Sequence, residues 1–173
     1  MRLFVAVNFT DEIKKRLLEI QERLRSQCLS GNFTRSENLH LTLAFLGETP
    51  EGKLPLLFQI MDGMKFSPFE VSFNHTGCFT HSRKELWWIG AGKNDACLQA
   101  LRSIHGQLLS RLLEAGFSVD ERPFNPHITL GREIKHSQPI TLDCPGIAAK
   151  VSRISLMRSE RIKGVLTYTE LLP

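Results

Sequence analysis

The chain has 173 residues, 42% of them hydrophobic and 23% charged, and its net charge is +4 at pH 7. This size and composition suit one globular domain with a core of its own. They argue against a membrane-spanning helix, because no apolar run approaches the roughly 18 residues required. The basic residues are dispersed, so the positive charge favours an anionic partner only weakly. The four cysteines are widely spaced and form no Cys-x-x-Cys pair, which predicts thiols in a reducing compartment, the cytoplasm, rather than a disulfide or zinc framework.

The first half of the chain predicts strand, helix, strand and helix in that order. Residues 2–7 are rich in β-branched and aromatic side chains, as strands are. Thr10 can cap a helix, and an apolar stripe at helical spacing follows it: Ile13, Leu17, Ile20 and Leu24. Residues 39–46 alternate between apolar and other side chains, which predicts a strand, and residues 51–64 predict a second helix.

The second half repeats this order. Residues 69–73 and 86–91 predict strands, and Asp95 can cap the helix that follows. That helix carries an apolar stripe and ends at a glycine suited to a C-terminal cap: Leu98, Leu101, Ile104, Leu108 and Leu112, then Gly116. Further strands are expected at 126–130, 148–157 and 165–172. Because strand, helix and histidine-bearing strand occur twice, we predict one α+β domain, residues 1–173, built of two similar lobes.

Two motifs of the same form, His-Leu-Thr-Leu at 40–43 and His-Ile-Thr-Leu at 127–130, lie 87 residues apart in the predicted strands. Side chains alternate across a strand, so each histidine shares a face with the threonine two residues later, while the apolar residues face the core. If a pseudo-two-fold axis relates the lobes, both pairs face one groove. One imidazole can then take a proton from water while the other protonates a departing oxygen. The threonine hydroxyls can donate to the non-bridging oxygens of a phosphate.

A structural role for these histidines has to be weighed against the catalytic one. A single histidine in a half-buried strand is more often structural, but packing does not demand the same two polar residues twice. Neither copy supplies a third ligand beside its histidine, so we expect no metal. The remaining histidines show no such pattern and are expected at the surface or in structural roles: His75, His81, His105 and His136.

The motifs and their flanks resemble the 2H phosphoesterases, a family named for two His-x-Ser/Thr-x motifs. RLFVAVNF at 2–9, ENLHLTLAFLGE at 37–48 and RPFNPHITLGR at 122–132 are similar, in this order, to RNA 2′,3′-cyclic phosphodiesterases, also called 2′-5′ RNA ligases. The resemblance covers essentially the whole chain. It implies antiparallel sheets and flanking helices around a central groove. It also implies an enzyme without cofactors that hydrolyses 2′,3′-cyclic phosphate RNA ends to 2′-phosphomonoesters.

The resemblance also implies roles for five residues. His40 would be the general acid at the leaving 3′ oxygen and His127 the general base for water, an order that the two nearly identical motifs do not fix by themselves. The residues that would bind the phosphate are Thr42, Thr129 and Arg132.

Strict alternation raises a question about two of the residues near the motifs. It turns Arg132 away from the face of His127, although Gly131 can end or bulge the strand and turn the guanidinium back. It also places Phe45 with the core leucines, where we expect it to pack. Other aromatic residues could stack on RNA bases, but each is more typical of a core: Phe9, Phe79, Phe124, Trp87 and Trp88.

Two other functions compete with hydrolysis. A 2′-5′ RNA ligase would join a 2′,3′-cyclic end to a 5′-hydroxyl with the same residues, although water at its bulk concentration favours hydrolysis. Degraded motifs would favour a third function, a non-catalytic module that binds RNA ends. Both motifs here are intact. The expected partners are RNA with 2′,3′-cyclic phosphate ends, including tRNA fragments, and small cyclic nucleotides. We expect no membrane partner and a monomeric chain.

Overall fold

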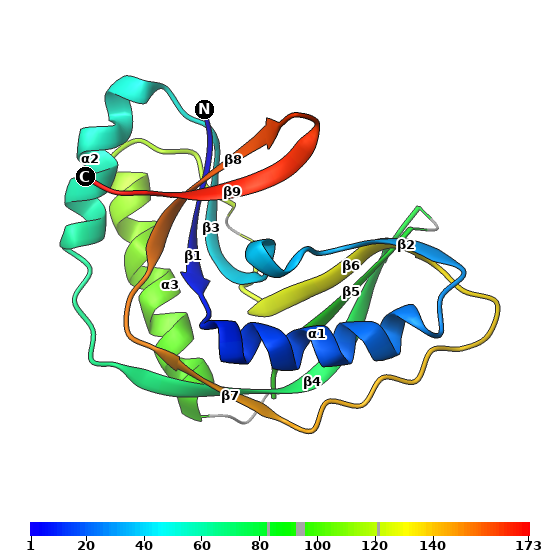
Figure 1. The fold of residues 1–173 in the computed structure, drawn as a ribbon. Helices are drawn as coiled ribbons and strands as arrows, with labels where there is room; N and C mark the ends of the chain where they lie inside the picture. The colour runs from blue at the N-terminus through cyan, green and yellow to red at the C-terminus, as the bar shows by residue number, and fades with distance from the viewer. Residues whose placement is uncertain (83, 93–95, 121) are drawn as a thin grey trace.

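The computed structural model describes residues 1–82, 84–92, 96–120 and 122–173. Its α-helices pack against one face of a continuous antiparallel sheet (Figure 1). Asp95, the expected helix cap, lies outside the described residues, as does the side chain of Cys97. The described cysteines are free thiols: Cys28, Cys78 and Cys144. Within the described ranges, no helix is both long enough and apolar enough to cross a membrane.

The elements of the first half are β1 (Arg2–Asn8), α1 (Asp11–Arg25), β2 (Ser30–Phe33), a 3₁₀ turn (Ser36–Asn38), β3 (His40–Glu48), a second 3₁₀ turn (Glu51–Lys53) and α2 (Leu54–Asp62). Thr10 caps α1 as predicted, because its Oγ1 accepts the N–H of Ile13 at 3.4 Å. The second predicted helix begins as a 3₁₀ turn, and Pro55 stands in the first turn of α2, where its missing N–H is tolerated. β2 was not predicted, because Ser-Gly-Asn-Phe has no β-branched residue and no apolar run.

The elements of the second half are β4 (Phe69–His81), β5 (Lys84–Ala91), α3 (Ala96–Glu114), β6 (His127–Lys135), β7 (Ile147–Val151), β8 (Ser155–Ile162) and β9 (Val165–Leu171). The predicted apolar stripe of α3 is buried. Gly116, at φ 74°, ends the helix as predicted, and the N–H of Phe117 donates to the carbonyl of Leu112 at 2.9 Å. The strand predicted at 148–157 is two strands, because β7 pairs with β4 whereas β8 pairs with β1 in the other half of the sheet.

The order of the strands shows the repeat. The sheet runs β7-β4-β5-β6-β3-β1-β8-β9, and β2 pairs with β6 beside this path. β5, α3 and β6 hold in one half the places that β1, α1 and β3 hold in the other, which confirms the two similar lobes. The halves meet where Leu41 of β3 pairs with Ile128 of β6, a contact that we call the seam. Each seam residue is the middle residue of a His-x-Thr motif, so the two motifs lie side by side at the centre of the sheet.

The two faces of the sheet differ in what covers them. Side chains from every α-helix enter the main core on one face, among them Leu17 of α1, Leu57 of α2 and Leu108 of α3, each 0% exposed. In Figure 1, α1 crosses the sheet while α2 and α3 stand side by side. The other face carries a small apolar cluster that contains Phe4 and Met157. The helices therefore leave this second face available for the polar residues of the motifs.

Two glycines, one in the middle of α3 and one just after it, predict opposite effects on stability. Gly106 lies inside the helix with open space where a Cβ would be, so Gly106→Ala should raise the free energy of unfolding by about 0.5–1 kcal/mol. Gly116 has a positive φ, so Gly116→Ala should lower it by about 1 kcal/mol. Chemical denaturation of both variants measures the two effects. A stabilised Gly116→Ala variant would contradict the left-handed cap.

Candidate active site

Both motifs place their polar side chains on the face of the sheet that the helices leave uncovered. The seam residues Leu41 and Ile128 are fully buried, at 0% exposure. Because successive side chains alternate across a strand, the histidine and threonine on either side of each seam residue point away from the core. The strands are antiparallel, so the histidine of each motif lies toward the threonine of the other. The structure thus brings together four predicted residues on what we call the motif face: His40, Thr42, His127 and Thr129.

The same backbone contact fixes each imidazole ring. Nδ1 of His40 donates to the carbonyl oxygen of Asn38 at 2.6 Å, and Nδ1 of His127 donates to the carbonyl oxygen of Asn125 at 2.7 Å. A carbonyl only accepts, so Nδ1 carries a hydrogen in both rings and Nε2 is the nitrogen that can exchange a proton with a substrate. Nε2 of His40 lies 3.0 Å from Oγ1 of Thr42. These carbonyls were missed at the sequence level, although Asn-x-His occurs in both motifs.

Both imidazoles are neutral at neutral pH when no anion is bound. Burial is the main cause that lowers the pKa of His40 to about 4, and the positive charge of Arg132 acts in the same direction, against the effect of the hydrogen bond to Asn38. Burial also lowers the pKa of His127, again with a contribution from Arg132. Whichever ring acts as an acid must therefore gain its proton when a negative charge binds beside it.

Arg132 lies on the motif face because of a β-bulge. The partners of Thr129 and Gly131 in β5 are consecutive residues, so Leu130 is the extra residue of β6. The bulge shifts the alternation by one position: Leu130 and Gly131 are both buried, and Arg132 is exposed. Of the two effects expected of Gly131, an end of the strand or a bulge, the structure has a bulge, at the neighbouring Leu130, and the strand continues to Lys135. The charge of Arg132 lowers the pKa of both histidines, so the guanidinium lies near enough to interact electrostatically with both rings.

The same bulge occurs in β3, and it changes the place of Phe45. The partners of Thr42 and Ala44 in β1 are consecutive, so Leu43 is the extra residue. Phe45 therefore lies on the motif face and is 52% exposed. The expectation that Phe45 packs with the core leucines was wrong, because no glycine marks this bulge in the sequence. Phe45 precedes Arg132 by 87 residues, the spacing of the motifs, so extending the repeat would have predicted its orientation.

Aromatic rings pack against both histidines. The ring centroid of His40 lies 4.9 Å from that of Phe4 and 5.1 Å from that of Tyr168. The ring centroid of His127 lies 6.0 Å from that of Trp88. These contacts supply the apolar surroundings that lower the pKa of each imidazole.

The aromatic residues considered for base stacking fall into two groups. Phe9 and Trp88 are buried, each 8% exposed, and Trp87 and Phe124 pack against the main core. Phe79 is 39% exposed, so the expectation that it belongs to the core was wrong. The strand predicted to end at residue 73 continues past Phe79 and carries its side chain to the motif face.

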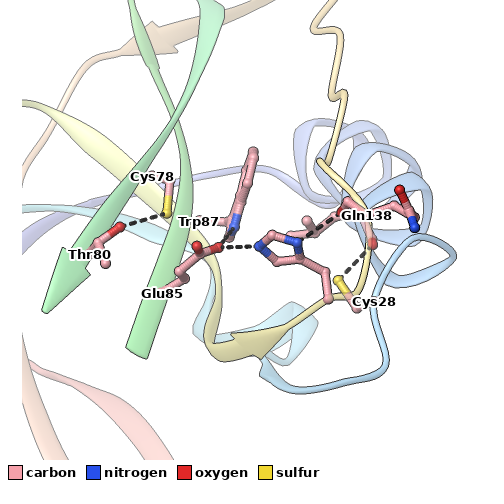
Figure 2. A network of polar contacts seen from close by, with 8 residues as sticks. Cys28, Cys78, Thr80, Glu85, Trp87 and Gln138 are labelled. Carbon is pink, nitrogen blue, oxygen red and sulfur yellow. Dashed lines mark hydrogen bonds and ion pairs between the residues drawn. The ribbon is translucent and has the colours of Figure 1, made fainter. Parts of the chain in front are cut away.

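A separate polar cluster occupies the opposite side of the second half (Figure 2). Glu85 accepts a hydrogen bond from Nε1 of Trp87 at 2.9 Å and pairs with Nε2 of His136 at 3.0 Å. Nδ1 of His136 lies 2.9 Å from the carbonyl oxygen of Gln138. Burial raises the pKa of Glu85, but the hydrogen bonds from Trp87 and His136 outweigh it and the pKa is lowered. The cluster joins β5 to the segment after β6, in keeping with the structural role expected of His136.

The five predicted site residues contribute two imidazoles, two hydroxyls and one guanidinium to the motif face. Within the part of the chain that the structure describes, no three His, Cys, Asp or Glu side chains gather as metal ligands would. Hydroxyl and guanidinium donors suit the oxygens of an anionic group, and imidazoles suit proton transfer near neutral pH. The arrangement can therefore bind an anion and move protons on either side of it.

Comparisons with known proteins agree on one family. Residues 9–163 match the model of the 2′-5′ RNA ligase superfamily. The RNA 2′,3′-cyclic phosphodiesterase of Archaeoglobus fulgidus is 34% identical over 145 residues, which are 83% of this chain and 78% of that protein. The one from Geobacillus stearothermophilus is 33% identical over 139 residues, which are 79% of this chain but 43% of that longer protein. The crystal structure of E. coli LigT complexed with 3′-AMP superposes with a TM-score of 0.83 at 27% identity, covering 99% of this chain and 95% of LigT.

Burial of His40 predicts how stability depends on pH. Its pKa is about 4 in the folded chain and about 6.5 when unfolded. The unfolded state therefore binds more protons between these values, and the free energy of unfolding falls as the pH falls from 6.5 to 4. At its largest the loss is about 3 kcal/mol. His40→Gln, neutral at every pH, should lose this contribution. Denaturant unfolding at pH 7 and pH 4.5 tests it, and an equal pH dependence of both proteins would contradict a neutral, half-buried His40.

Proposed function

Because this chain belongs to the 2′-5′ RNA ligase superfamily, we propose that it is an RNA 2′,3′-cyclic phosphodiesterase, which hydrolyses cyclic phosphate ends to 2′-phosphomonoesters. One observation carries this proposal: the seam sets two histidines on one face, and each is held through Nδ1 so that Nε2 is left for proton transfer. Hydrolysis at phosphorus needs one group to take a proton from water and another to give one to the leaving oxygen.

In the proposed reaction, water attacks the phosphorus and the bond from phosphorus to the 3′ oxygen breaks. Nε2 of His127 takes a proton from the attacking water, and Nε2 of His40 gives a proton to the 3′ oxygen. The products are a 2′-phosphate and a 3′-hydroxyl, with His127 protonated and His40 neutral. Proton exchange with solvent then restores the starting state. Each transfer typically contributes a factor of about 10² to 10⁴ to the rate.

The proposed phosphate site consists of Thr42, Thr129 and Arg132. The hydroxyls and the guanidinium donate to the non-bridging oxygens, where negative charge develops. The positive charge of Arg132 lowers the pKa of both imidazoles. The bound phosphate offsets this charge. A negative charge beside an imidazole raises its pKa, so the acid is protonated in the complex although His40 alone has a pKa of about 4.

The burial of His40 supports the reverse order as a second candidate. Of the two histidines, His40 has the larger lowering of its pKa, to about 4, which suits a neutral base. The two assignments differ in which histidine gives a proton to the leaving oxygen. They agree on the products and on the phosphate site.

The proposed substrates are RNA ends that carry a 2′,3′-cyclic phosphate, including those of tRNA fragments. Small 2′,3′-cyclic nucleotides are included, because the proposed contacts of His40, His127 and Arg132 are all with the terminal phosphate and its neighbouring oxygens. The reverse reaction, in which a 5′-hydroxyl replaces water, would join two RNA ends with the same groups. We propose that the chain acts as a cytoplasmic monomer.

The proposed function is tested with an oligoribonucleotide that ends in a 2′,3′-cyclic phosphate. In excess EDTA, the wild-type chain should convert this end to a 2′-phosphate, identified by ³¹P NMR, and His127→Ala should be slower by about 10² to 10⁴. A 3′-phosphate product would contradict the proposed bond cleavage. Activity lost on chelation and restored by a divalent ion would contradict a mechanism that rests on two histidines. A joined product in the presence of a 5′-hydroxyl strand would indicate the ligase.

Replacing the 3′ oxygen of the cyclic phosphate with sulfur separates the acid from the base. A thiol ionises far more readily than an alcohol, with a pKa of about 8.5, so sulfur leaves without a proton donor. On this substrate His40→Gln should approach the wild-type rate, while His127→Gln should stay slower by about 10² to 10⁴. Single-turnover rates of both variants on both substrates measure the effect. Recovery of His127→Gln instead would reverse the two roles.

A further inference from the structure

The motif face continues from β6 across β5 to β4. Trp88 of β5 pairs with Thr129 of β6 on one side and with Gly77 of β4 on the other. Directly paired residues of antiparallel strands share a face, so Gly77 lies on the same face as Thr129. Cys78 and Thr80 alternate with it and belong to the polar cluster on the opposite side (Figure 2).

Phe79 stands in the next row of this face. Leu86 of β5 pairs with Arg132 on one side and with Phe79 on the other. The ring of Phe79 packs edge-on against His127, with centroids 5.2 Å apart and an interplanar angle of 85°. It is 39% exposed. Phe79 is therefore an open aromatic surface that touches one histidine and shares a row with the arginine proposed to bind phosphate.

Trp88 holds this aromatic surface in place. Its indole lies over Gly77, so closely that a Cβ on that glycine would come within 2.2 Å of the ring. The ring of Phe79 packs on one side of Trp88 at 5.2 Å, and the ring of His75 packs at 5.6 Å. Trp88 is only 8% exposed, which means that its neighbours cover it. Phe79 thus rests on a buried indole, and a stacking surface supported in this way orders a ligand at little entropic cost.

We propose that Phe79 stacks against the base of the nucleotide that carries the cyclic phosphate. The proposal rests on the proposed function, which places the phosphate between His40 and His127. Neighbouring strands are about 4.8 Å apart, so β4 lies about 10 Å from β6, a span that one nucleotide bridges from a phosphate at Arg132 to a base at Phe79. Every base has a π face, so a single stacked ring accepts all four bases. The site is thereby suited to RNA ends of any sequence.

Phe45 provides the matched comparison on the other side of the seam. It lies on the same face and is 52% exposed, and its ring packs 6.1 Å from that of Phe4. It belongs to the half of the sheet that lacks Arg132. If the phosphate is held from the side of Arg132, the base lies nearer to Phe79 than to Phe45.

Two substrates with the same phosphate test the subsite: adenosine 2′,3′-cyclic phosphate, and 1-O-methylribose 2′,3′-cyclic phosphate, which has no base. Phe79→Leu should raise KM for the adenosine substrate by about 5- to 100-fold, the range expected for one stacked base. It should leave kcat, and both constants for the base-free substrate, as in the wild-type chain. Phe79→Tyr should restore the wild-type KM, and Phe45→Leu should change neither constant.

Three results would overturn the subsite. A lower kcat on both substrates in Phe79→Leu would make Phe79 a support for the ring of His127. A higher KM in Phe45→Leu alone would place the base in the other half of the sheet. Equal Kd values of the wild-type chain and Phe79→Leu for 2′-AMP, measured by calorimetry, would exclude stacking without reference to turnover. A wild-type chain that binds 2′-AMP through Phe79 but turns over neither substrate would contradict the proposed function and leave the base subsite standing.

Discussion

The arrangement of the motif face depends on one contact, the pairing of Leu41 with Ile128 at the seam. Both side chains are fully buried, and side chains alternate along each strand. Burying these two residues therefore forces the histidine and threonine of each motif to the opposite face. A slip of one residue in either strand would move its histidine into the core and a large apolar side chain into the open. The hydrophobic core thus fixes the register that places the two imidazoles together.

The two halves share a backbone plan but differ in chemistry. The same bulge follows the threonine in β3 and in β6, at Leu43 and at Leu130. In each half it turns the next long side chain to the motif face, and that side chain is Phe45 in one half and Arg132 in the other. The guanidinium of Arg132 makes the two halves of the site unequal, because an anion bound between the histidines gains more from the half that contains Arg132. The base subsite proposed at Phe79 lies in that same half.

Most of the candidate site could be predicted from the sequence, because the orientation of its side chains depends on local strand geometry. Strand alternation and the repeated motif placed both histidines and both threonines, and Gly131 indicated the bulge that orients Arg132. The bulge at Leu43 left no such mark, so Phe45 was assigned to the core. The second half of β4, Asn-His-Thr-Gly-Cys-Phe, shows no apolar alternation, so Phe79 was placed wrongly. The acceptors at Asn38 and Asn125 are backbone carbonyls, whose positions follow from the fold and not from a side-chain type.

The central claim is that His40 and His127 act on one phosphate in one transition state. It is tested most directly by kcat/KM for His40→Ala, His127→Ala and the double variant, on an RNA end with a 2′,3′-cyclic phosphate. Each single variant should lose about 10² to 10⁴ in rate. The double variant should be far less impaired than the product of the two losses, because residues that act as a unit are not additive. Fully multiplicative losses, or near-normal turnover by a folded His40→Ala variant, would contradict the account.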